Sequence, residues 1–160
     1  MSLSLIETSL ELAAERCQDL TPVVYDRLFT QYPDMQALFW RDTNHSVKGE
    51  MLAKVFEALL DFAGERKYAA AMIQCEVITH EGYDVPPDVF RIFFAVVADS
   101  IREVLGEAWT PPMAAAWQDL LEQLDYFVTH PDQYETIAAA KTAGAAQSLL
   151  QKRAPVFKGT

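Results

Sequence analysis

Hydrophobic residues recur every three or four positions along most of this chain, which is the period of an amphipathic helix. The clearest stripes are Met51, Val55, Leu59 and Phe62; Phe90, Phe94, Val97, Ile101 and Leu105; and Met113, Trp117, Leu120, Leu124 and Phe127. No segment alternates with period two, and no Asn-Gly or Asp-Gly hairpin turn occurs. The pattern therefore predicts an all-α protein.

Proline and glycine divide this pattern into separate helices, because proline favours the first helical position and glycine the position after the last. The predicted helices cover residues 4–20, 22–32, 34–40, 45–63, 66–80, 86–105, 110–129 and 133–152. They give seven or eight helices of unequal length, with a domain at 1–130. Residues 131–160 then form a C-terminal extension, whose alanine-rich helix packs on the body or contacts another subunit.

Composition and charge narrow the class of protein. Hydrophobic residues make up 51% of the chain and charged residues 22%, which is typical of a globular protein. The formal net charge of −10 argues against nucleic acid and anionic lipid as partners, because phosphate binding needs clustered lysine and arginine. The longest apolar run, residues 92–98, is too short to cross a bilayer, and no signal peptide is evident. Cys17 and Cys75 match no metal-ligand or redox spacing, so we expect a cytoplasmic protein with two free thiols.

One titratable residue ends a hydrophobic stripe. In the segment VITHEGYDV, residues 77–85, His80 shares a helix face with Ile73 and Val77. A histidine in this position can pack at the helix end, act as a buried hydrogen-bond donor, or bind a metal. The local pattern alone favours a packed histidine, because most histidines bind no metal.

Three segments, in their order and spacing, resemble the globins, in particular the single-domain bacterial globins related to flavohaemoglobin. VYDRLFTQYPDMQALF is similar to that family's second-helix segment, HEGYDV to the stretch from its proximal histidine, and EVLGEAWTPPMAAAW to its last interhelical turn. The resemblance covers about residues 5–129. It implies a globin fold that binds haem, expected to be haem b.

The resemblance also implies roles for individual residues. His80 falls at the position of the proximal histidine, whose neutral imidazole binds the haem iron. Phe39 matches the phenylalanine that packs on the haem face, and Val85 matches the residue that touches the haem edge. Tyr25 matches the distal tyrosine, whose hydroxyl points at the bound gas in many bacterial globins.

The distal helix has two possible registers in this sequence. Either Val47 or Lys48 faces the ligand, followed one turn later by Met51 or Leu52. Bacterial relatives often carry glutamine in this region, and this segment has none. His45 lies just upstream and would reach the iron only if the helix were shifted.

These residues imply a globin that reversibly binds O₂, and NO or CO, at pentacoordinate iron. An empty pocket of ~300 Å³ would cost roughly 7 kcal/mol, which favours a pocket filled by haem. Phe90 stands where flavohaemoglobin-like chains carry a tyrosine that hydrogen-bonds on the proximal side, which weakens the case for peroxidase-like chemistry. A nitric oxide dioxygenase is one alternative, and it would depend on a separate reductase because no G-x-G-x-x-G loop occurs. A haem-free globin-like sensor or interaction domain is the other.

Overall fold

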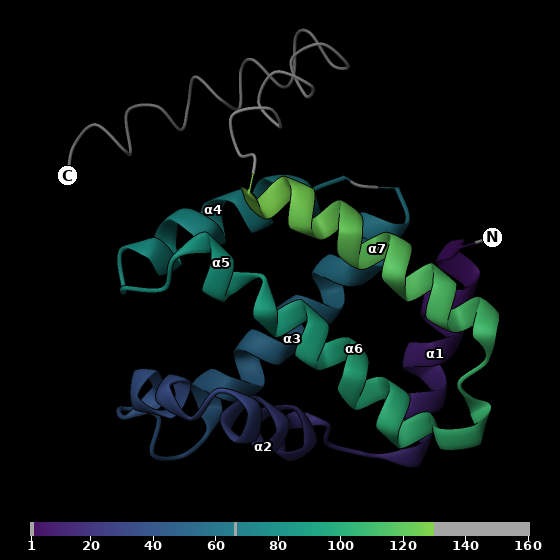
Figure 1. Cartoon of the computed structure of the whole chain (residues 1–160), viewed down its shortest axis with the longest axis horizontal. Coiled ribbons are helices and arrows are strands. Elements are labelled where there is room, and N and C mark those ends of the chain that lie inside the picture. The colour runs from purple at the N-terminus through teal and green to yellow at the C-terminus, as the bar shows by residue number, and fades with distance from the viewer. Residues whose placement is uncertain (1, 66, 130–160) are drawn as a thin grey trace, which may run out of the picture.

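Helices make up most of the part of the chain that the structure describes, residues 2–65 and 67–129 (Figure 1). The structure is a computed structural model. Its elements in chain order are α1 Ser2–Arg16, α2 Thr21–Gln31, η1 Pro33–Phe39, α3 Ser46–Ala63, α4 Ala69–Glu81, α5 Pro87–Phe90, α6 Ile92–Leu105, η2 Gly106–Ala108 and α7 Pro111–Thr129, where η marks a 3₁₀ helix. The predicted all-α fold is confirmed. The helix predicted at 133–152, and the rest of the predicted extension 131–160, lie outside the described residues.

The prediction of a single helix at 86–105 is wrong, because the structure divides this segment into α5 and α6. The division falls at Arg91, whose backbone keeps helical angles of φ −63° and ψ −26°. The two pieces differ in their main neighbours: α5 contacts α4 and α7, whereas α6 contacts chiefly α1 and α2, and α7 to a smaller extent. Arg91 itself donates a hydrogen bond to Asp125 Oδ1 of α7 at 2.8 Å. Contacts with distant elements therefore decide where this helix breaks.

The first two helices are also separated earlier than predicted. The first helix ends at Arg16 rather than near residue 20. The Asp19 carboxylate then accepts the backbone N–H of Thr21 at 2.9 Å, at the start of α2. Pro33 stops α2 as predicted, and the following segment continues as the 3₁₀ helix η1.

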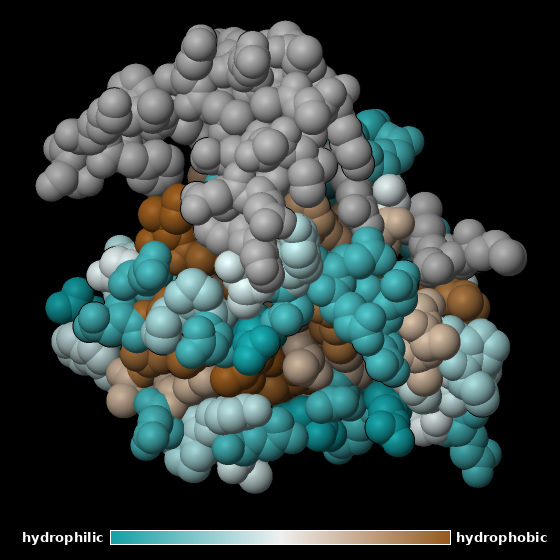
Figure 2. Space-filling view, turned by 45° about the horizontal axis from the view of Figure 1, so that its top comes forward, coloured by the Kyte–Doolittle hydropathy of each residue, from teal (hydrophilic) through white to brown (hydrophobic). Residues whose placement is uncertain are grey.

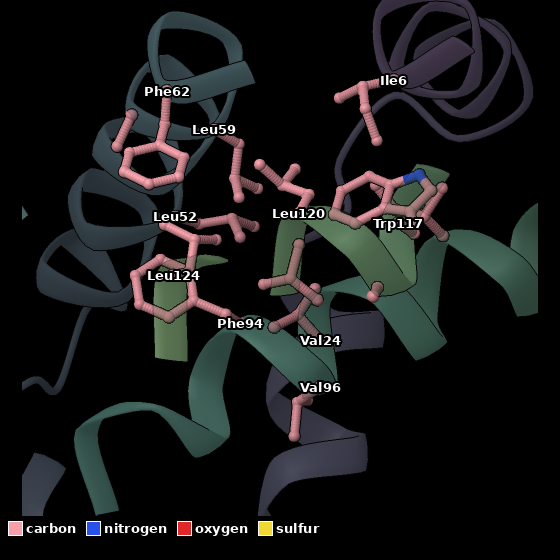
Figure 3. Close-up of a cluster of buried hydrophobic side chains, with 14 of the residues drawn as sticks. Ile6, Val24, Leu52, Leu59, Phe62, Phe94, Val96, Trp117, Leu120 and Leu124 are labelled. Atoms are coloured by element: carbon pink, nitrogen blue, oxygen red, sulfur yellow. The ribbon is translucent and has the colours of Figure 1, made fainter. Parts of the chain in front are cut away.

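The helices pack around one hydrophobic core. In Figure 1, α6 crosses the middle of the view with α2 on one side and α7 on the other. α1 packs on α6 and α7, α2 on α6 and η1, and α3 on α4. Figure 3 shows side chains from these helices pointing toward one another: Ile6, Val24, Leu52, Leu59, Phe62, Phe94, Trp117, Leu120 and Leu124. The core thus joins the N-terminal helix to α7, far along the chain.

A polar contact crosses this core. The indole Nε1 of Trp117 donates to Ser9 Oγ at 2.9 Å, and Ser9 Oγ donates to the carbonyl of Ile6 at 2.7 Å. Trp117 is 1% exposed and Ser9 is fully buried, so neither donor can hydrogen-bond to bulk water in place of its protein partner. The contact fixes the position of α7 on α1.

The outer surface is mixed. On the face drawn in Figure 2, hydrophilic side chains predominate and hydrophobic ones show between them. Within the described residues, no helix combines the length and the apolar character that spanning a membrane would require.

Candidate functional site

A cavity of about 590 Å³ lies between η1 and α3 on one side and the end of α4, α5 and the start of α6 on the other. This volume is within the roughly 300–1,000 Å³ that small-molecule and cofactor sites occupy. Five of the seven site residues predicted from the sequence line it: Phe39, Val47, Met51, His80 and Val85. The other two, Tyr25 and Lys48, lie outside the set of lining residues.

His80 stands in the last turn of α4 with one ring nitrogen already bonded. Its Nδ1 lies 2.7 Å from the carbonyl oxygen of Glu76, one turn earlier. A carbonyl only accepts, so Nδ1 carries the proton and the lone pair is left on Nε2. The ring packs edge-on against Phe90, with centroids 4.9 Å apart. The imidazole is thus held in the tautomer that metal-ligating histidines use.

The turn after His80 is closed by that residue's own carbonyl. The carbonyl accepts the N–H groups of Tyr83 and Val85, each at 2.9 Å. Asp84 adopts a positive φ of 65° between them, a conformation that aspartate tolerates better than most residues. The chain therefore folds back at once, and Val85 reaches the cavity next to His80.

The start of α4 is fixed by a carboxylate from α3. Asp61 accepts the backbone N–H groups of Lys67, Tyr68 and Ala69 at 3.2, 3.0 and 2.7 Å. Burial acts to raise the pKa of Asp61, but these three N–H donors hold the pKa below its ordinary value. The sequence predicted that this helix begins at residue 66, but α4 begins at Ala69. The three hydrogen bonds to Asp61 explain the difference, because they hold the backbone at the start of the helix.

Aromatic rings form the wall of the cavity near η1. Phe39 packs edge-on against Tyr25 at 5.4 Å between centroids and lies 5.7 Å from Phe29. Tyr25 also contacts Phe93 at 5.6 Å. Phe39 and Phe93 line the cavity, and Tyr25 stands behind both. Tyr25 therefore supports the wall and is not part of its surface.

The Tyr25 hydroxyl has a partner on α3. It donates to the backbone carbonyl of Lys48 at 3.1 Å, in a buried environment. Burial, and after it the negative charge of Asp42, raises the pKa of the Tyr25 hydroxyl above its ordinary value, so the phenol stays protonated.

The N-terminus of α3 is capped by Asp42 and carries a buried lysine. Asp42 Oδ1 accepts the N–H of Val47 and Oδ2 the N–H of Lys48, each at 3.0 Å. The Lys48 ammonium lies 3.6 Å from Asp42 Oδ2, 3.2 Å from His45 Nδ1 and 5.5 Å from the centre of the Phe39 ring. Burial acts to raise the pKa of Asp42, but the two backbone donors and the Lys48 charge hold it below its ordinary value.

This cap sets the register of α3. Val47 and Met51 turn to the cavity, whereas Lys48 and Leu52 are buried away from it. His45 precedes the helix in a left-handed conformation (φ 62°), is exposed, and does not line the cavity.

Several lining residues were not identified from the sequence. On α3, Val55 and Ala58 continue the stripe of Val47 and Met51, so its helical spacing of three or four residues could have revealed them. Lys54 of α3 also lines the cavity, and the rest of the wall comes from other elements: Leu28, Met35, Ala37, Leu38, Trp40, Arg41, Asp42, Met72, Ile73, Glu76, Thr79, Tyr83, Val89, Phe90, Phe93 and Phe94. Their hydrophobic members are indistinguishable from core residues in the sequence, because both kinds follow the same helical period.

The chain belongs to the globin family, whose sequence model matches residues 23–127. This confirms the resemblance seen in the sequence motifs. Among individual proteins, the chain is similar to a flavohemoprotein of Vibrio cholerae serotype O1, with 25% identity over 118 residues. The matched stretch covers 72% of this chain and 29% of the flavohemoprotein, so the chain spans less than a third of that relative's length. No solved structure gives a significant match.

Proposed function

We propose that this globin holds haem in the 590 Å³ cavity, with His80 as the protein ligand of the iron, and that it reversibly binds a diatomic gas. The observation that carries the proposal is the state of His80. Its Nδ1–H is committed to the Glu76 carbonyl, and its ring stands in the wall of a largely apolar cavity. A neutral imidazole with a free Nε2 lone pair is the ligand that haem iron takes from a globin.

The cavity wall also suits the rest of a haem group. Phe39, Phe93 and Phe90 offer flat apolar surfaces for a porphyrin, and Val85 stands at the edge beside His80. Arg41 and Lys54 are cations among the lining residues, and both are exposed, so either would be available to pair with a haem carboxylate. The sequence carries no C-x-x-C-H attachment motif, which supports haem b, held without thioether bonds.

When bound, haem would supply a ferrous iron that takes O₂, NO or CO. The chain's own residues hold and orient the group and limit the access of water. The Glu76 carbonyl fixes the rotation of the His80 ring, and the Glu76 carboxylate lies 3.7 Å from the same Nδ1. No contact among the described residues favours nitric oxide dioxygenation or a separate reductase over reversible binding, so reversible binding is the proposed function.

The test is the absorption spectrum of the purified chain, alone and titrated with hemin. We expect a Soret band that His80→Ala weakens or abolishes and that added imidazole restores. His45→Asn is the matched control, because asparagine accepts a left-handed backbone and His45 does not line the cavity. Its spectrum should equal the wild type.

Two results would overturn the proposal. A folded chain that takes up no hemin would favour the haem-free sensor or interaction domain. A His80→Ala spectrum identical to the wild type would place the iron ligand elsewhere.

A further inference from the structure

The α3 wall of the cavity offers no buried hydrogen-bond donor. Four of its five lining residues, Val47, Met51, Val55 and Ala58, recur at helical spacing and are apolar, and the fifth, Lys54, is exposed. Because the backbone N–H groups beyond the first turn of a helix bond within it, these side chains decide the polarity of the wall. Met51 stands in the middle of the stripe.

The polar residues elsewhere in the described wall do not supply a buried donor either. The Thr79 hydroxyl donates to the Cys75 carbonyl at 3.0 Å. The Asp42 carboxylate only accepts, and backbone N–H groups occupy both of its oxygens. The Arg41 guanidinium stacks on the Trp40 ring at 4.6 Å, and that ring is 71% exposed. The remaining polar side chains of the wall are exposed, carry a carboxylate, or belong to His80: Lys54, Glu76, His80 and Tyr83.

The polar groups of Tyr25 and Lys48, which do not line the cavity, have partners elsewhere. Tyr25 has one hydroxyl proton, and the Lys48 carbonyl accepts it at 3.1 Å. The Lys48 ammonium turns to Asp42 and His45, at 3.6 and 3.2 Å, and lies over the Phe39 ring. Neither can donate into the cavity without giving up a buried partner, which is unfavourable.

We propose that this globin discriminates against O₂ and favours CO and NO, and that Met51 is the residue that sets this selectivity. The inference rests on the proposed function. Bound O₂ carries partial negative charge and is held by a nearby donor, whereas bound CO is nearly apolar and needs none. An apolar wall therefore leaves bound CO unaffected and leaves O₂ without a hydrogen-bond partner, so O₂ dissociates fast.

The experiment uses the full-length, haem-loaded chain and adds a donor at the proposed position. Met51→Gln keeps the length of the side chain and introduces an amide N–H. A hydrogen bond of ordinary net strength should slow O₂ dissociation by about two- to tenfold. The CO dissociation rate should stay within about twofold, because bound CO gains little from the donor. Ala53→Gln is the matched control: it places the same amide on an exposed position of α3 outside the cavity, and both rates should be unchanged.

Tyr25→Phe tests the other half of the inference. Because the Tyr25 proton already has an acceptor, its removal should leave the O₂ dissociation rate within about twofold of the wild type. The C–O stretching frequency of the CO-saturated protein gives an independent readout. It should be unchanged in Tyr25→Phe and shifted to lower wavenumber in Met51→Gln.

Each result decides the question. A clearly faster O₂ dissociation in Tyr25→Phe, with a shifted C–O stretch, would show that the hydroxyl faces the gas and would overturn the inference. So would a Met51→Gln variant with unaltered O₂ dissociation and C–O stretch. Loss of the Soret band from the wild type would instead overturn the proposed function.

Discussion

Removal of haem should destabilise this protein, because it empties the cavity and removes the free energy of haem binding. If sealed and empty, a space of 590 Å³ would cost about 14 kcal/mol at ~24 cal/mol per Å³. That figure is comparable to the whole stability of a domain, about 5–15 kcal/mol. The cavity is open at its mouth, so water can enter and the cost is smaller. Haem bound at a free concentration about a thousand times its Kd would stabilise the fold by about 4 kcal/mol.

The assay is thermal unfolding of the haem-loaded protein and of the same preparation after extraction of haem. A chain of this length shifts its Tm by about 2–4 °C per kcal/mol, so we expect the extracted protein to melt roughly 8–16 °C lower. The loss should be local. Val85, Val89 and Phe90 are only partly buried, whereas Ile101 and Trp117 lie fully inside the core.

Hydrogen exchange distinguishes a local change from a general one. Amides from the end of α4 through α5 should exchange faster after extraction, while those of α6 and α7 around Ile101 and Trp117 should keep their protection. The reasoning would be refuted if the two preparations showed equal Tm and equal protection although the haem-loaded one has a Soret band. In that case haem would bind outside the cavity.

Two further predictions concern the packing that positions the site. Asp61→Ala removes the acceptor of three backbone N–H groups at the start of α4 and should lower the unfolding free energy by about 0.5–2 kcal/mol at pH 7. Because the folded-state pKa of Asp61 lies below the ordinary 3.8, its contribution is complete above pH 3.8 and is lost as the pH falls through the folded pKa. Urea unfolding should therefore show a smaller deficit at low pH, and an unchanged deficit would contradict this. Ser9→Ala leaves the buried Trp117 N–H without its acceptor and should cost about 1–3 kcal/mol. A double-mutant cycle with Trp117→Phe should show coupling in urea unfolding, and strictly additive effects would speak against the bond.

The fold was accessible from the sequence because its signals are local. Helical periodicity and the positions of proline and glycine lie within single segments, and they located nearly every described helix. The errors arise where distant residues decide. The break at Arg91 accompanies contacts of α5 with α4 and α7 and an ion pair with Asp125, thirty-four positions away.

The candidate site was predictable in part for the same reason. His80 ends an apolar stripe, and the globin motifs around it gave that position a role. The choice between Val47 and Lys48 needed the Asp42 cap, whose two backbone bonds set where α3 begins. The direction of the Tyr25 hydroxyl depends on a carbonyl of another helix, and no sequence pattern encodes that contact.

The cavity lies between two consecutive helices that are joined closely at one end. Asp61, near the end of α3, accepts the N–H groups at the start of α4. From that end, lining residues follow α3 back from Ala58 to Val47 and α4 forward to His80. One carboxylate therefore fixes the start of the helix whose last turn carries His80. Met51 stands on the other helix, so we expect a substitution at Met51 to leave His80 in place. On the proposed function, such a substitution should change gas selectivity while His80 remains available as the iron ligand.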